Sequence, residues 1–409
     1  MILRKIHIFC LALLCTLIPI YQIGFLSWTI VTLFILTMVL LNTNRKVEWW
    51  NVIMSGAGVF IFFLISMLWT ANVSVGWKSI ETKLSLILIP LILGLSPPIT
   101  KRQFLFISWA VVYSVIISSL MLICLAYLRF EHSTDIREFS YIKFSAHFHP
   151  SYISMYYAAA LCLIKFHLEK VSGSKSFKFF LRFTTILLVI MIALLSSKAG
   201  VLSCFAILII ALFRNLTKNK NGRNTYFLAS VTLLLLTSVF FNPATKSRMG
   251  SVMNAPKEVV SNLDNDKTTA TKISSTKART IVWGIALEML YDNPSGEGVG
   301  DAKASLMRRY EKDEQYYMLS KKLNVHNQFL ETGISSGLIS LLFMLIMFLY
   351  LFIKAFRNRD MLMLSLLVII TLNLLTESMF ERQSGAVFIS LFIGLLLFRD
   401  QGEKKFISS

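Results

Sequence analysis

A histidine–asparagine pair stands where the longest hydrophilic segment of the chain meets an apolar run. His326 and Asn327 directly precede this run, which begins near Thr332. An imidazole titrates near neutral pH, so it is the natural side chain to take a proton from a hydroxyl group. The alternative is an interfacial histidine that only anchors a helix end. Asn327 could orient the imidazole or a substrate, or it could cap the helix that begins there.

Two cations of the sequence could bind an anionic ligand. Arg279 opens a helical pattern with Trp283 one turn later, and a guanidinium can bind phosphate through two parallel hydrogen bonds. Lys198 follows Ser196 and Ser197 in a tight turn between two apolar runs. A lysine buried at such a turn is costly and usually functional. A solvated side chain is the alternative for Arg279, and snorkelling to the surface is the alternative for Lys198.

Further ionisable residues lie in two other connections between apolar runs. Glu377, Glu381 and Arg382 stand in the last predicted external turn, where they could bind substrate or form structural ion pairs. His149 ends an earlier external connection and is followed by Pro150.

Two motifs look like a phosphate-binding loop and a metal-binding motif, but both are better explained as turns. Gly296, Gly298 and Gly300 do not follow a strand and lack the spacing of a phosphate-binding loop, so a turn-making role is favoured. Asp264-Asn265-Asp266 has the D-x-D form of metal-dependent glycosyltransferases, but it lies among Ser, Thr and Lys and is typical of a solvated turn. No His/Cys cluster has metal-ligand spacing, so we expect neither a metal site nor a cofactor.

The elements around these residues are those of a membrane protein. Of the 409 residues 55% are hydrophobic and only 15% are charged, and the mean hydropathy is +0.65. The net charge of +19 lies largely in alternate connections, such as Arg4 and Lys5, Arg45 and Lys46, and Lys101 and Arg102. This positive-inside pattern predicts that both termini are cytoplasmic. It also explains the basic character without nucleic acid, which we do not expect as a partner.

Apolar runs of membrane-spanning length recur along the whole chain. They predict an all-α polytopic membrane protein with about twelve transmembrane helices and a large external, periplasmic loop. We divide the chain into helices 1–9 (residues 1–241), the loop with the catalytic residues (242–331), and helices 10–12 with a cytoplasmic tail (332–409). The predicted spans are 6–22, 24–41, 51–70, 84–98, 103–128, 150–168, 180–197, 199–214, 225–241, 332–353, 361–376 and 384–399.

The large loop contains two predicted amphipathic helices. The first begins near Ala278, has an apolar face of Ile281, Ala286, Leu287 and Leu290, and stops at residues 292–294. The second covers about 301–317. These helices predict a cap on the outer membrane surface. At the exit of the loop, Gly333 and Gly337 form a small-xxx-small face for close helix packing.

These motifs, in this order, resemble the O-antigen ligase/O-antigen polymerase family of bacterial membrane glycosyltransferases. The resemblance covers mainly residue 140 to the C-terminus. It rests on Arg279-(x3)-Trp283, the 293–301 segment, His326-Asn327-Gln328-Phe329-Leu330 with Gly333 and Gly337, His149-Pro150-Ser151-Tyr152, Ser196-Ser197-Lys198-Ala199-Gly200, and Glu377 through Gly385.

The resemblance implies a multi-pass enzyme of the bacterial inner membrane. Such a ligase transfers a glycan from undecaprenyl diphosphate to lipid A-core with inversion, and such a polymerase uses a lipid-linked repeat as acceptor. Motif matching assigns the acceptor hydroxyl to His326 and the diphosphate to Arg279. The family often has arginine where Lys198 stands. Lysine keeps the charge but cannot bind phosphate through the two parallel hydrogen bonds of a guanidinium, and Arg382 is a candidate to supply them. We predict Asn327, Trp283, His149, Glu377 and Glu381 as further substrate-binding residues.

A ligase is favoured, by analogy in span count and loop length, and a polymerase is the alternative. A transporter or flippase is the alternative from another class. Transporters usually carry ionisable residues near mid-membrane, often in repeats, whereas here these residues crowd the external face and no repeat is visible.

Overall fold

A computed structural model describes residues 2–20, 24–39, 47–146, 148–171, 174–217, 222–241 and 275–399. Within these ranges the fold is all-α, as predicted, and contains no strand. The one β pairing among them is an isolated bridge between Ile99 and Arg399. The Asp264-Asn265-Asp266 motif and the first part of the predicted loop, 242–274, lie outside the described residues.

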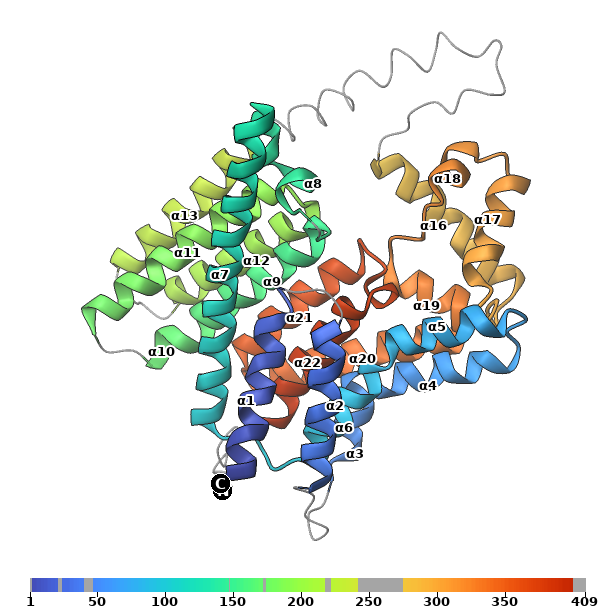
Figure 1. Cartoon of the computed structure of the whole chain (residues 1–409), viewed down its shortest axis with the longest axis horizontal. Coiled ribbons are helices and arrows are strands. Elements are labelled where there is room, and N and C mark those ends of the chain that lie inside the picture. Colours follow the sequence, from blue (N-terminus) through green and yellow to red (C-terminus); the bar gives the residue numbers. More distant parts are fainter. Residues whose placement is uncertain are drawn as a thin grey trace.

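Each predicted span coincides with a helix or a stack of helical segments (Figure 1). The predicted ends differ by a few residues in both directions: α12 extends to Thr217, past the predicted end at 214, whereas α6 ends at Leu95, before the predicted end at 98. The elements are α1 (Ile2–Leu17), α2 (Gly24–Val39), α3 (Trp49–Val52), η1 (Ile53–Ala57), α4 (Gly58–Ile65), η2 (Ser66–Leu68), α6 (Ser85–Leu95), α7 (Lys101–Ser133), α9 (Pro150–Leu163), η4 (Ile164–Leu168), α10 (Glu169–Val171), α11 (Lys175–Leu195), α12 (Lys198–Thr217), α13 (Gly222–Phe241), α20 (Leu338–Arg357), α21 (Met361–Leu374) and α22 (Gln383–Phe398).

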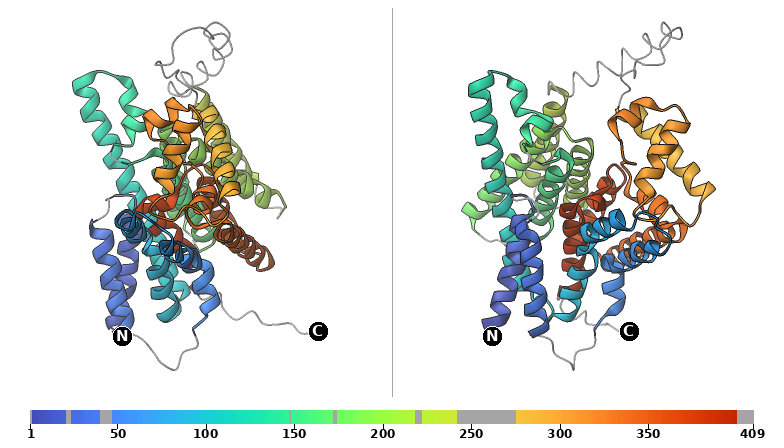
Figure 2. Two further views of the ribbon diagram at one scale, coloured as in Figure 1. Left: turned by 90° about the vertical axis from the view of Figure 1, so that its right-hand side faces the viewer. Right: turned by 45° about the vertical axis from the view of Figure 1, so that its right-hand side comes forward.

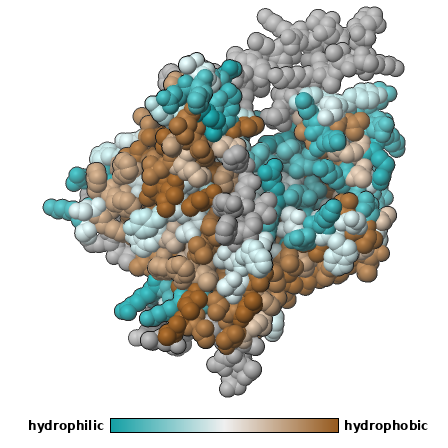
Figure 3. Space-filling model, viewed as in Figure 1, coloured by the Kyte–Doolittle hydropathy of each residue, from teal (hydrophilic) through white to brown (hydrophobic). Residues whose placement is uncertain are grey.

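The apolar helices indicate an integral membrane protein. Five helical segments of the described chain are long and apolar enough to cross a membrane, and three shorter apolar helices accompany them. The total of twelve spans stays a prediction. Hydrophobic residues cover much of the face in Figure 3. Hydrophilic residues gather at its upper right, over α16 (Ser275–Asp292), α17 (Ala302–Lys312) and α18 (Tyr316–Lys321), and over the end of α7.

The start of α1 lies at one end of the molecule, and α16–α18 lie toward the opposite end (Figure 2). At one end, a guanidinium nitrogen of Arg4 in α1 donates to the carbonyl oxygens of Pro97 and Pro98, at 2.6 and 3.0 Å. The backbone N–H of Ile99 donates there to the carbonyl of Phe398, at the end of α22. The opposite end holds the predicted external elements, and we call it the site end.

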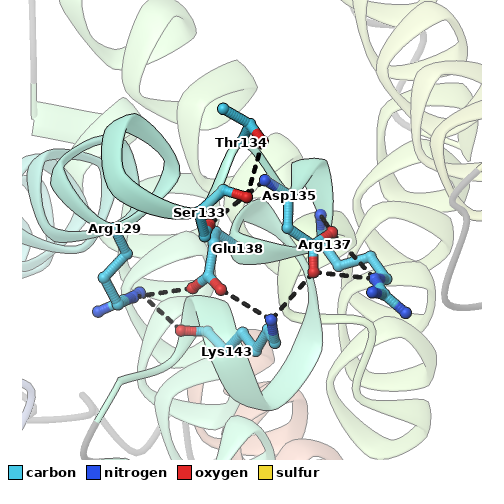
Figure 4. Close-up of polar contacts among 7 residues, drawn as sticks. All are labelled: Arg129, Ser133, Thr134, Asp135, Arg137, Glu138 and Lys143. Atoms are coloured by element: carbon cyan, nitrogen blue, oxygen red, sulfur yellow. Dashed lines mark hydrogen bonds and ion pairs between the residues drawn. The ribbon is translucent and has the colours of Figure 1, made fainter.

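Helix α7 is longer than the predicted span 103–128. Its 33 residues amount to about 50 Å at 1.5 Å per residue, whereas a hydrocarbon core is about 30 Å thick. The capping box of Thr100 begins it, and Thr134 in the left-handed conformation ends it. Arg129 and Lys143 both bind Glu138 there, and so brace the helix end on η3 (Ile136–Phe139) and α8 (Tyr141–Phe144) (Figure 4).

The described part of the large loop folds into a cap, defined here as residues 275–327. It consists of α16 (Ser275–Asp292), α17 (Ala302–Lys312) and α18 (Tyr316–Lys321). The predicted second helix is therefore two helices, since Glu314 has a φ of 55° and interrupts it. The cap has a hydrophobic core that Ile334, from the segment after the cap, completes. Its members within the cap are Ala278, Val282, Ile285, Ala286, Met289, Ala302, Leu306, Tyr310, Met318 and Val325.

Among the residues of the predicted apolar face, Leu287 points away from that core. The side chain of Leu287 is 54% exposed. The buried positions of α16 begin at Ala278 and continue at i+4, i+7, i+8 and i+11, and Leu287 at i+9 lies half a turn away from the first.

The predicted span 332–353 is broken in the structure. Helix α19 (Gln328–Ser336) ends at Gly337, which has a φ of 92°, and α20 follows. A Cβ atom on Gly337 would lie 2.7 Å from the carbonyl oxygen of Ser295. One on Gly296 would lie 2.5 Å from the nitrogen of Gly337. The predicted turn-making role of the glycine-rich segment is thus confirmed: it is the point where the cap packs closely on the break between α19 and α20.

Candidate active site

The carboxylate of Glu377 joins three elements of the site end. Glu377 lies in the connection between α21 and α22, residues 375–382, which we call the site loop. Its Oε2 lies 3.0 Å from Nδ1 of His326, and its Oε1 lies 3.0 Å from a guanidinium nitrogen of Arg279. The hydroxyl of Ser151 in α9 donates to Oε1 at 3.3 Å, and Ser197 donates in turn to Ser151 at 3.2 Å.

These donors fix the charge of Glu377. Burial alone would raise the pKa of this carboxyl, but the hydrogen bond with His326 and the positive potential of His149, His326 and Arg279 outweigh it. The pKa of Glu377 is therefore held below its usual value. An ionised carboxylate only accepts hydrogen bonds, so Nδ1 of His326 carries a hydrogen and donates it. In the neutral imidazole the lone pair is then on Nε2, the atom a general base needs.

The backbone around His326 is held in an unusual conformation. His326 has a φ of 50°, in the left-handed region that few residues other than glycine adopt. On one side, the indole nitrogen of Trp283 donates to the carbonyl of Val325 at 3.0 Å. On the other side, Oδ1 of Asn327 accepts from the N–H of Phe329 and so caps α19. The capping interpretation of Asn327 is confirmed, and Trp283 supports the same turn.

Arg279 lies in the first turns of α16, where it faces the site loop. Its side chain is 24% exposed. A guanidinium has five N–H donors, and one of its nitrogens contacts Glu377, so further donors can bind a phosphate group.

His149 faces the same carboxylate from α9, which it caps. Its Nδ1 accepts from the backbone N–H of Ser151 at 3.4 Å. Burial lowers the pKa of His149 most, and the nearby charge of Arg382 lowers it further, against the opposite effect of Glu377. With Nδ1 occupied as an acceptor, the hydrogen of a neutral His149 is on Nε2, where it can donate to a ligand.

The remaining predicted cations lie around this centre. The guanidinium of Arg382, an exposed residue of the site loop, lies 5.7 Å from the ring centroid of Tyr152. Lys198 is exposed at the start of α12 and directly follows Ser197. The structure thus brings Arg279 and His326 into direct contact with Glu377. Lys198 follows Ser197, which is hydrogen-bonded through Ser151 to the same carboxylate.

Glu381 points to a different partner. Its Oε1 lies 2.7 Å from Nζ of Lys83, which ends α5 (Val73–Lys83). Beside this pair, the hydroxyl of Ser378 donates to the buried carboxylate of Glu331 at 3.2 Å. Burial, followed by the charge of Glu381, raises the pKa of Glu331 to about 7, although Lys83 and Ser378 act in the opposite direction.

Several residues of this arrangement were not among the predicted site residues. Ser151 and Ser197 occur in the motifs His149 through Tyr152 and Ser196 through Gly200, but a serine alone carries no signal. Lys83 and Glu331 carry a weak one, since each is a charged residue directly beside an apolar run. Within the described residues no group of His, Cys, Asp or Glu has the arrangement of a metal site.

Comparison with known proteins supports the predicted resemblance. The family model described as O-antigen ligase matches residues 183–345, from α11 into α20. The matched stretch contains Lys198, Arg279 and His326 and ends before Glu377. No curated protein matches the chain. The match confirms the predicted resemblance: it supports an O-antigen ligase-like family, an O-antigen ligase or polymerase type of function, and a membrane glycosyltransferase-like enzyme.

Proposed function

We propose that this protein transfers a glycan from undecaprenyl diphosphate to a sugar hydroxyl of lipid A-core, with His326 as the general base. The observation that carries the proposal is the contact of one carboxylate, Glu377, with both His326 and Arg279. Through this contact an imidazole with a defined tautomer and a permanent cation share one carboxylate, which supports a base and a cation in one site. Transfer of a glycan from a diphosphate needs both: a base for the acceptor and positive charge for the leaving group.

The transfer step is a displacement at the anomeric carbon of the donor. The acceptor hydroxyl gives its proton to Nε2 of His326, and its oxygen forms the new bond to the anomeric carbon. The bond between that carbon and the diphosphate oxygen breaks, and the electron pair leaves with undecaprenyl diphosphate. Attack opposite the leaving group inverts the configuration. The imidazolium is stabilised by Glu377, as in other His–carboxylate pairs.

The diphosphate is proposed to bind the cations around Glu377. Arg279 provides the fork, and Arg382 and Lys198 add charge from the site loop and from the start of α12. Nε2–H of His149 provides a neutral donor. Fixed cations stabilise charge that develops on the leaving group, so we propose a reaction that is independent of metal and cofactor.

Trp283, Asn327 and Glu381 are predicted substrate-binding residues for which the contacts described above favour a supporting role. Trp283 and Asn327 hold the turn that contains His326. We propose that their effect on the substrate is exerted through that turn.

The membrane side and the acceptor complete the proposal. We propose the bacterial inner membrane, with the site end facing the periplasm and both termini in the cytoplasm. Polymerisation onto a second lipid-linked repeat uses the same donor and the same base, and no contact of the site favours it over ligation.

An in vitro assay separates the two acceptors. Purified protein is given lipid-linked glycan as donor with either lipid A-core or a second lipid-linked repeat. We expect product on lipid A-core, and His326→Ala should bind donor yet transfer almost none of it. Product on the lipid-linked repeat alone assigns a polymerase, and normal transfer by His326→Ala contradicts the proposed base.

A further inference from the structure

A second charged cluster lies on the other side of the site loop from Arg279. Lys83 is 1% exposed, although it is a lysine at the end of a surface helix. It binds Glu381 of the site loop at 2.7 Å and the hydroxyl of Ser79 at 2.7 Å. Glu331, one and a half turns after His326, is also buried and accepts a hydrogen bond from Ser378. None of these five residues, Lys83, Glu381, Ser79, Glu331 and Ser378, contacts the reacting groups of the proposed step.

Such a cluster needs an explanation other than stability. Removing Lys83 and Glu331 from water is costly, and the attraction between opposite charges repays this cost only in part. A well-packed apolar pair often stabilises a fold equally well or better. The ion pair between buried Lys83 and the 36% exposed side chain of Glu381, however, fixes the relative position of the two segments that carry it. Here these segments are α5 and the site loop, which are about 300 residues apart in the chain.

Helix α19 and the residues before it hold the same loop by three successive contacts. His326 binds Glu377, and Glu331 accepts from the hydroxyl of Ser378. Oε1 of Gln328 accepts from the backbone N–H of Phe380 at 2.6 Å. The His326–Glu377 contact therefore depends on the position of the whole 377–381 segment, and a shift of this segment by one residue would break it.

We infer that Lys83 and Glu331 are positioning residues, which hold Glu377 against His326 through residues 377–381. The inference rests on the proposed role of His326. Lys83 fixes the loop from α5, by way of Glu381, and Glu331 fixes it from α19, by way of Ser378. Neither residue touches the substrate in this scheme, and both act through the tautomer and orientation that Glu377 imposes on His326.

Protonation of Glu331 belongs to the same scheme. The groups that face it are Lys83 from α5, Glu381 and Ser378 from the site loop, and Tyr310 from α17. With Glu331 neutral, Lys83 and Glu381 form a balanced pair. With Glu331 ionised, two carboxylates share one lysine; burial and the charge of Glu381 oppose this state, whereas Lys83 and the hydrogen bond from Ser378 favour it.

The test uses variants that leave no uncompensated charge in the interior. The double variant Lys83→Met/Glu381→Gln removes the ion pair, and Glu331→Leu removes the acceptor for Ser378. Glu331→Gln keeps a hydrogen-bond acceptor and serves as the conservative variant. The matched control is Lys143→Met/Glu138→Gln, because Lys143 and Glu138 form an ion pair of the same 2.7 Å length near the end of α7 (Figure 4).

The first readout does not depend on the substrate. The rate at which diethyl pyrocarbonate modifies His326 is followed by mass spectrometry as a function of pH in full-length protein. We expect Lys83→Met/Glu381→Gln and Glu331→Leu to change this pH dependence in the same direction as Glu377→Gln does. Glu331→Gln and the control should match the unaltered protein at neutral pH.

The second readout is transfer activity. A displacement of a catalytic group by about 1 Å can cost about 100-fold, so we expect a 10- to 100-fold lower kcat with a nearly unchanged KM for donor. An unchanged modification profile of His326 in the folded fraction of both disruptive variants overturns the inference, whatever their thermal stability. If instead His326→Ala retains transfer, the proposed function fails, while the modification profile still decides whether Lys83 and Glu331 position the loop.

Discussion

Oε2 of Glu377 lies 3.0 Å from Nδ1 of His326, while its other oxygen is bound to Arg279. One carboxylate thus defines the tautomer of His326 and the position of Arg279. The two partners are 51 and 98 residues away from Glu377 in the chain, and they come from the turn before α19 and from α16. This relationship makes the consequences of single substitutions specific.

Glu377→Gln should lower kcat by about 10²- to 10⁴-fold, because an amide does not hold His326 in the required tautomer or stabilise its imidazolium. The double variant His326→Ala/Glu377→Gln should be no slower than His326→Ala, since the two residues act as a unit. Steady-state transfer assays measure both effects. Glu311→Gln, an exposed carboxylate of the cap, is the control. If the losses in kcat of the two single variants add in the double variant, His326 and Glu377 do not act as a unit.

Arg279→Lys keeps the charge but removes the planar fork. A hydrogen bond to a charged group contributes about 1.5–3 kcal/mol, so we expect the KM for donor to rise about 10- to 100-fold. Arg308→Lys, in an exposed position of α17, should leave KM unchanged. Equal KM values for Arg279→Lys and the unaltered protein would remove Arg279 from the diphosphate site.

Glu331 should make thermal stability depend on pH. Its pKa in the folded protein, about 7, is above the ordinary 4.5, so the folded protein holds this proton more tightly than the unfolded chain. Stability therefore falls as pH rises from about 4.5 to about 7 and levels off above that range. Glu331→Gln lacks this loss, and its Tm in detergent should rise relative to the unaltered protein across the same window. Parallel Tm curves would show that Glu331 is ionised throughout.

Chelation should leave the reaction unaffected. Because we propose that protein cations stabilise the leaving diphosphate, EDTA in excess over any divalent metal should not change kcat. The measurement is transfer by purified protein before and after EDTA, with magnesium added back as the control. A loss of activity that added magnesium reverses would indicate that a metal ion stabilises the leaving diphosphate.

Gly337→Ala should destabilise the protein by about 1–3 kcal/mol. The φ of Gly337 is 92°, and an added Cβ atom would lie 2.7 Å from the carbonyl oxygen of Ser295. Gly284→Ala is the matched control, since its Cβ would meet nothing within 4 Å in the interior of α16. That substitution should stabilise by about 0.4–1 kcal/mol. Melting temperatures in detergent compare the two, and a similar Tm for both variants would contradict the close packing.

The helices could be predicted because membrane spans depend on the length of apolar runs, a local property. The break at Gly337 could not, since a glycine in an apolar run is compatible with an unbroken helix unless a distant backbone packs on it. His326, Arg279 and Glu377 were predicted as candidates from residue type and position. Their shared contact could not be predicted, because it depends on how α16, α19 and the site loop come together. Lys83 was missed for the same reason.

The junction between the cap and α5 has a consequence for protein engineering. The carboxylate of Asp301 accepts the backbone N–H groups of Ala71 and Asn72, at 2.6 and 3.1 Å. A Cβ on Gly298 would lie 2.6 Å from the hydroxyl of Thr70. The glycine-rich segment of the cap and the residues before α5 are thus complementary in shape and in hydrogen bonding. A chimera that exchanges the cap between two such enzymes should fold only when residues 69–76 are transplanted with it.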